Sequence, residues 1–203
     1  MATRHISNPS LYRHAMPLAY QEPRTGLGKL LDNIADFLTE YWVHIVTVVL
    51  GSLVLCAISV PFLSYLGLDS IAKPIFFSLH LVCAQIPSHS FYILGHQLGL
   101  CARNFSIYTS MFIGSFIFLL AKKRMRGIPW WLWILMMVPM ALDGTTQLFG
   151  WRESDWMLRV VTGALFGAGN IWFALPLMQK SLTETIVPQI PPALLKRYQN
   201  HTV

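Results

Sequence analysis

Two cysteines in the middle of the chain, Cys83 and Cys101, have side chains that can do chemistry together. Facing an oxidising compartment they could form a disulfide, and with His80, His89 or His96 as further ligands they could bind a metal ion. His80 and Cys83 are three positions apart, so they share one face of a helix. Free cysteine is also among the most buried residue types, so two separate packed thiols are a third interpretation. The sequence leaves all three open and assigns no metal site.

An acid and a base in two consecutive apolar segments suggest a buried ion pair. Asp143 lies well inside one segment, where an unpaired carboxylate is costly, and Arg159 enters the next at a similar depth. We expect these two side chains to pair. The pair could serve as a proton relay or as an anchor for a polar headgroup. One acid with one base makes no chain of titratable groups, however, so a structural pair that fixes the register of two helices is favoured.

The remaining motifs predict packing rather than catalysis. Gly163 and Gly167 form a Gly-x-x-x-Gly spacing that lets a second helix approach closely. His44, beside Trp42, could ligate a haem or pigment, but a lone histidine near an interface more often bonds to water or headgroups. The chain has no Walker loop, dinucleotide-binding fingerprint, zinc-protease motif or Gly-x-Ser-x-Gly. The sequence therefore predicts no catalytic residue and leaves the cofactor unknown.

Composition indicates which solvent surrounds these residues. Of 203 residues, 54% are hydrophobic and only 12% are charged, and the mean hydropathy is +0.50. Soluble domains usually carry about 25% charged residues. This excludes a secreted disulfide scaffold, a disordered chain and a coiled coil. The net charge of +6 is typical of cytoplasmic loops of a membrane protein rather than of nucleic-acid binding.

The elements that must position the motifs are predicted to be helices. Residues 1–24 read as a polar tail and 25–41 as an amphipathic interfacial helix, and 179–203 form a second tail. Between the tails we expect a transmembrane bundle over 42–178, with an irregular loop at 87–104. Its predicted spans are 42–66, 105–121, 130–149 and 156–178. The short segment 71–86 could be a re-entrant or interfacial helix, or a fifth span.

The distribution of Lys and Arg favours four spans over five. With four spans both termini are cytoplasmic, and 11 basic residues lie inside against 4 outside. With five spans the count becomes 8 to 7. The predicted fold is therefore an all-α, polytopic bundle of four spans plus a short re-entrant or interfacial helix, with 80–104 at the non-cytoplasmic face.

Several motifs resemble the predicted integral membrane family named domain of unknown function 2085. They are Cys83-Ala84-Gln85-Ile86-Pro87-Ser88-His89-Ser90-Phe91, then Gly95, then Cys101-Ala102-Arg103-Asn104-Phe105-Ser106-Ile107-Tyr108, and later Asp143-Gly144-x-x-Gln147, Arg152-Glu153-Ser154 and Arg159-x-x-Thr162-Gly163-x-x-x-Gly167. The likeness covers about 71–169. The family's pattern has Cys-His and Cys-x-x-Cys, which offer four soft metal ligands, whereas this chain has Ala84 and Asn104 at two of those positions.

Because two of the four possible ligands are missing, the sequence favours a non-catalytic role. We expect an accessory or scaffold subunit of a larger membrane complex, respiratory or photosynthetic, in which residues 1–40 contact neighbouring subunits. The predicted partners are these subunits and the lipid bilayer, and not nucleic acid. The alternative is a membrane enzyme, or a metal or thiol protein, whose site at Cys83 and Cys101 acts on a lipid or quinone-like substrate.

Overall fold

The computed structural model describes residues 26–121 and 125–186. The elements follow one another as α2 (Gly26–Tyr65), α3 (Asp69–Ser78), η2 (Leu79–Leu81), η3 (Pro87–His89), β1 (Ser90–Ile93), β2 (His96–Cys101), α4 (Ala102–Leu120), α5 (Trp130–Leu148) and α6 (Trp156–Ile186). The predicted tail at 1–24, the basic residues at 122–124 and the part of the predicted C-terminal tail from 187 onward lie outside the described residues. The predicted tail begins at 179, but residues 179–186 continue helix α6.

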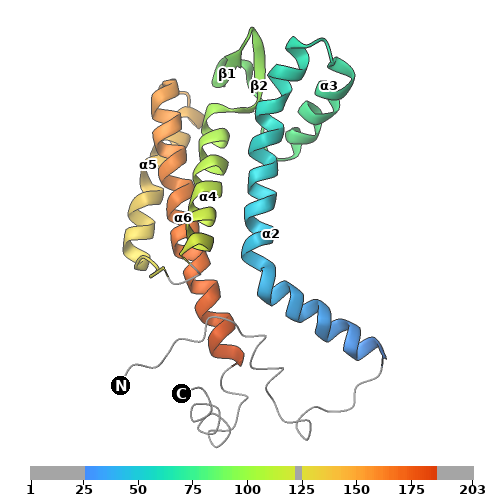
Figure 1. Cartoon of the computed structure of the whole chain (residues 1–203). Helices are drawn as coiled ribbons and strands as arrows, with labels where there is room; N and C mark the ends of the chain where they lie inside the picture. The colour runs from blue at the N-terminus through green and yellow to red at the C-terminus, as the bar shows by residue number, and fades with distance from the viewer. Residues whose placement is uncertain (1–25, 122–124, 187–203) are drawn as a thin grey trace, which may run out of the picture.

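The predicted interfacial helix and first span form a single helix, α2, of 40 residues. In Figure 1 the N-terminal part of α2, in blue, turns away from the bundle, and the remainder of the helix runs beside it. The side chains of this part are exposed, among them Leu31 and Phe37 at 58% and 55%. They contribute nothing to the core, so this part of α2 is held by its continuity with the packed part.

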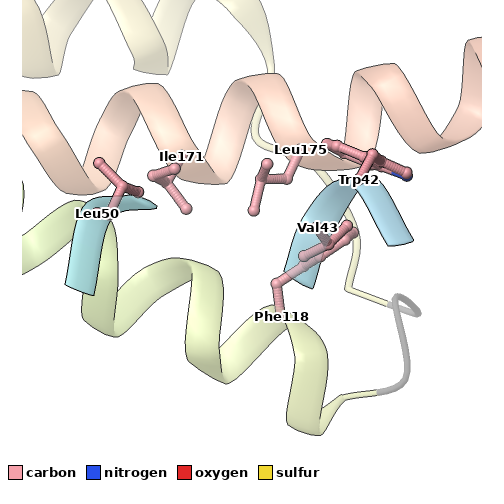
Figure 2. Close-up of a cluster of buried hydrophobic side chains, with 6 residues drawn as sticks. All are labelled: Trp42, Val43, Leu50, Phe118, Ile171 and Leu175. Atoms are coloured by element: carbon pink, nitrogen blue, oxygen red, sulfur yellow. The ribbon is translucent and has the colours of Figure 1, made fainter. Parts of the chain in front are cut away.

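Helices α2, α4 and α6 enclose the larger of two apolar clusters. Its buried members are Trp42, Val43, Leu50, Phe118, Ile171 and Leu175 (Figure 2). Helix α2 contributes the first three of these side chains, α4 contributes Phe118, and α6 contributes the last two. Val43 and Leu50 are seven positions apart and Ile171 and Leu175 are four apart, so each pair lies on one face of its helix. The cluster therefore joins the first long helix to the last one through α4.

The Gly-x-x-x-Gly motif on α6 lies against α4. A Cβ atom on Gly163 would lie 2.7 Å from the carbonyl oxygen of Arg103, and one on Gly167 would lie 2.5 Å from that of Ile107. Both contacts advance by four residues on each helix, so α4 and α6 run parallel. Their N-terminal ends consequently meet at the same end of the bundle, which the hairpin occupies in Figure 1.

The prediction of an all-α fold was incomplete, because the expected loop at 87–104 contains an antiparallel hairpin. Strands β1 and β2 pair Ser90 with Cys101 and Ile93 with His96, and Leu94 and Gly95 turn the chain at φ of +53° and +80°. A Cβ on Gly99 would lie 2.9 Å from the Cα of Ala57, so β2 lies directly on α2. Strands of four and six residues are too short for alternation to be recognised.

Two of the described helices are long and apolar enough to cross a membrane, over Lys29–Tyr65 and Trp156–Leu182. Helices α4 and α5 have 19 residues each and carry polar groups at the hairpin end, including Arg103 and Asp143. Helix α3 has only 10 residues and is followed by a short 3-10 turn. At 1.5 Å per residue α3 is about 15 Å long, half of a hydrocarbon core.

Candidate functional site

The hairpin brings the two central cysteines together. Cys83 follows η2 and Cys101 ends β2, and their Sγ atoms lie 3.2 Å apart. The backbone N–H groups of Cys101 and Gln85 donate to the Cys83 sulfur at 3.3 and 3.4 Å. Cys83 is buried at 5% exposed, Cys101 is partly exposed, and both are free thiols in the structure. Cys56 is a free thiol within α2.

Gln85 holds this arrangement in place. Its backbone has a φ of +51°, in the left-handed region that is uncommon for a residue with a side chain. Its amide nitrogen donates to the carbonyl oxygens of Phe76 at 2.8 Å and Gly99 at 2.7 Å, so it links α3 to β2. Gln97 in turn donates to the Gln85 carbonyl at 2.9 Å. These bonds fix the loop whose N–H points at Cys83.

The two thiols have unequal acidity because they share one hydrogen bond. The contact with the Cys101 side chain lowers the pKa of Cys83 to about 5, and the two backbone N–H bonds act in the same direction, against burial. The same contact with Cys83, together with burial, raises the pKa of Cys101. Near neutral pH Cys83 therefore carries the thiolate, and Cys101 keeps the proton that bonds to it.

The histidines that could have served as metal ligands are used differently. His80 Nδ1 contacts the side-chain oxygen of Gln85, and His96 lies in the hairpin opposite Ile93. Asn104 donates to the carbonyl of Val82 at 2.9 Å. Within 26–121 and 125–186, no group of three or more His, Cys, Asp and Glu side chains could hold a metal ion.

A second group of interacting side chains at the hairpin end is centred on Asp143. The residues that pair with Asp143 differ from the predicted partner. Asp143 is 1% exposed and forms ion pairs with Arg103 and, at 2.9 Å, with Arg152. Arg103 also donates to the amide oxygen of Gln147 at 2.9 Å. The predicted pairing of Asp143 with Arg159 is therefore wrong. Arg159 instead donates to the backbone carbonyl of Ser88 in η3, at 3.4 Å.

The error has a spatial cause. Depth along two consecutive helices favours Arg159, but the first turn of α4, which packs against α6, supplies Arg103 from 40 positions away. Arg152, in the turn after α5, reaches back to the same carboxylate. The motifs that resemble the family contain Gln85, Arg103 and Arg152. Their residue types and spacing do not indicate which groups they contact.

Comparison with known proteins places these residues in a family. The sequence profile described as "Predicted membrane protein (DUF2085)" matches residues 83–173. An uncharacterized protein of Methanocaldococcus jannaschii is 41% identical over 125 residues, which cover 58% of this chain and 80% of that protein. The chain belongs to the DUF2085 family. An uncharacterized protein of Methanothermobacter thermautotrophicus is 33% identical over 88 residues, 43% of this chain and 79% of that protein. No solved structure matches the chain.

The family match confirms the resemblance and includes both clusters. It begins at Cys83 and ends within α6, so it contains both cysteines, Asp143 and its two arginines. Helices α2 and α3 precede it. The hairpin end thus lies in the part of the chain that matches the family, and the exposed N-terminal part of α2 lies outside that part.

Proposed function

We propose that this chain is an integral membrane protein with a reversible dithiol–disulfide couple at its hairpin end. The observation that carries the proposal is the 3.2 Å separation of the Cys83 and Cys101 Sγ atoms. A disulfide bond is about 2.05 Å long, so the two atoms need to approach by only about 1.2 Å. The bond would join residues 18 positions apart and would stabilise the oxidised form by about 3 kcal/mol.

The unequal acidity of the two thiols determines how the couple would react. A partner thiol attacks the more accessible Cys101 sulfur, the protein S–S bond breaks, and Cys83 leaves as the thiolate that accepts two backbone N–H bonds. A thiol of low pKa is the better leaving group. A second partner thiol then displaces Cys101, which takes one proton, while the other proton goes to solution. Two partner thiols become one disulfide, and oxidation by a disulfide reverses these steps.

Counting free thiols tests this couple. Full-length protein in mild detergent is equilibrated with mixtures of reduced and oxidised glutathione, quenched in acid and alkylated, and its intact mass is measured. We expect two thiols to become protected together in a single two-electron transition, in wild type and in Cys56→Ser. Cys83→Ser should lack the transition. Persistent alkylation of both thiols under oxidising conditions would contradict the couple.

The metal alternative has its own measurement. If Cys83 and Cys101 hold a metal in the membrane, elemental analysis should find about one zinc or iron per chain, lost in Cys101→Ser. We expect no stoichiometric metal, because Ala84 and Asn104 stand at two of the four positions that could supply ligands. A full complement of metal would replace the redox proposal.

For the topology we propose four spans with both termini cytoplasmic. Helices α4 and α5, of 19 residues each, are about 28 Å long and match a hydrocarbon core of about 30 Å. Helix α3 is too short to cross, which supports four spans rather than five. Single cysteines at Ser7 and Ser70, introduced into a chain without native cysteines, test this with an impermeant reagent. We expect labelling from outside at Ser70, and labelling at Ser7 would refute the topology.

A second proposal, a role as accessory subunit of a larger membrane complex, is favoured by the N-terminal part of α2. Its exposed apolar side chains are Leu27, Leu30, Leu31, Ile34, Phe37, Leu38 and Tyr41. This face could lie against the membrane surface or against a neighbouring subunit. A photo-crosslinking residue at Leu31, with Phe116 on α4 as control, distinguishes them. A polypeptide adduct specific to position 31 would support the subunit role, and adducts with lipid alone would contradict it.

A further inference from the structure

One buried arginine at the hairpin end forms no ion pair with a carboxylate of the described residues. Arg103 and Arg152 share Asp143, whereas Arg159, at 6% exposed, forms no ion pair among the described residues. Its one hydrogen bond, to the Ser88 carbonyl, is 3.4 Å long, and its Nε is buried without a partner. A buried guanidinium with donors to spare favours binding an anion.

Two helix N-termini add to this positive potential. Helices α4 and α6 run parallel and both begin at the hairpin end, and neither has an acidic residue in its first turn. Each N-terminus carries about half a positive charge. Arg103 and Arg159 lie in these two first turns, and the Nε of Arg103 is also buried without a partner. Phosphate groups are commonly bound at such helix ends.

The basic side chains of the two helices converge on η3. The close contact of Gly163 with the backbone of Arg103 places the first turn of α4 about one helical turn along α6 from Arg159. Burial lowers the pKa of His89, the last residue of η3, and the charges of Arg159 and then Arg103 lower it further, while Glu153 opposes them. Both guanidiniums therefore act on the same imidazole, which is neutral at physiological pH and can still donate a hydrogen bond.

We propose that Arg159, Arg103 and His89 form a binding site for a phosphate group, carried by the headgroup of an anionic lipid or by free inorganic phosphate. The planar guanidinium of Arg159 would bind two oxygens of the phosphate, and its Nε–H belongs to the donor pair suited to this geometry. The site contains neither cysteine of the thiol pair, and it does not depend on the redox proposal.

Thermal unfolding of the full-length protein in detergent tests the free-phosphate source. Inorganic phosphate should raise the Tm of wild type more than chloride does at the same ionic strength. Arg159→Gln should weaken the phosphate affinity at least ten-fold. The matched control is Arg126→Gln, because Arg126 is exposed and its carbonyl accepts a hydrogen bond from Trp172, more than three turns along α6 from Arg159. Its phosphate affinity should stay within two-fold of wild type.

Native mass spectrometry tests the lipid source. Wild type and Arg126→Gln should retain phosphatidylglycerol in preference to phosphatidylcholine, and Arg159→Gln should lose this preference. An effect of inorganic phosphate alone, or of the lipid alone, supports the site and identifies its source. Absence of both effects in wild type overturns the proposal, whether or not Arg159→Gln folds. Equal binding by wild type and Arg159→Gln also overturns it.

Discussion

Removing the carboxylate of Asp143 should reveal which arginine it depends on. Asp143 is 1% exposed, the Arg103 side chain 19% and the Arg152 side chain 50%. Breaking a buried ion pair leaves an uncompensated charge and costs about 3–5 kcal/mol. A half-exposed pair contributes about 0–1 kcal/mol. We therefore expect Asp143→Leu and Arg103→Leu each to lower the free energy of unfolding by about 3–5 kcal/mol, and Arg152→Leu by about 1 kcal/mol or less.

Double-mutant cycles separate the two pairs. Unfolding of each variant in detergent is followed by the fluorescence of the chain's 7 tryptophans. Combining Asp143→Leu with Arg103→Leu should recover most of the loss, since an apolar pair of similar size often replaces a buried ion pair without cost. With single losses of about 3–5 kcal/mol and a double loss of about 1 kcal/mol, the coupling energy for this pair should be at least about 5 kcal/mol. That for Asp143 with Arg152 should stay below about 1 kcal/mol.

The cycle of Asp143 with Arg159 can refute this reasoning. The Arg159 guanidinium bonds to the Ser88 carbonyl and not to the carboxylate, so the two leucine substitutions should be additive within about 0.5 kcal/mol. A coupling as large as that with Arg103 would show that the charges are arranged differently. As a control, Glu153→Leu in the exposed turn between α5 and α6 should change stability by about 0.5 kcal/mol or less.

Three further predictions concern single positions. The rate of alkylation of Cys83, measured across pH by peptide mass spectrometry, should be half-maximal near the pKa of this thiol, about 5. Cys101→Ala should move that midpoint up towards the ordinary thiol value of about 8.5. An unchanged midpoint would show that the shared hydrogen bond does not lower the pKa of Cys83. Gly163→Ala should cost about 1–3 kcal/mol by forcing α4 and α6 apart, whereas Gly144→Ala, where a Cβ meets nothing within 4 Å, should cost no stability in the same unfolding assay. Gln85→Leu should cost about 1–3 kcal/mol for each of the two backbone carbonyls it leaves unpaired, and wild-type stability would show that water replaces the amide.

A close-packed face on α6 could be predicted from the sequence because it depends on local spacing. Gly163 and Gly167 are four positions apart, so they form one small-residue face whatever the partner helix is. The proximity of Cys83 and Cys101 followed from two of the three interpretations, the disulfide and the shared metal. In both cases the residue type itself, glycine or cysteine, indicates a close contact, and the residues concerned are near one another in the chain.

The hairpin and the partners of Asp143 could not be predicted in this way. The turn is made by Leu94 and Gly95, and leucine at a φ of +53° lacks the Asn-Gly or Asp-Gly signal of a two-residue turn. The ion pair with Arg103 joins residues 40 positions apart, at the start of α4 and near the end of α5. Whether Asp143 pairs with Arg103 or with Arg159 depends on how three helices pack in space. Charge and depth along the chain do not specify that packing.

The basic residues on the proposed non-cytoplasmic side connect the topology to the phosphate site. They are Lys73, Arg103, Arg152 and Arg159, and positive charge on that side opposes the proposed orientation. Three of them face acids: Lys73 lies 3.7 Å from Asp69, and Arg103 and Arg152 share the buried carboxylate. The fourth, Arg159, has no acidic partner among the described residues. A phosphate bound there would neutralise the remaining charge, so losing the phosphate site should weaken the folded hairpin end without reversing the orientation of the chain.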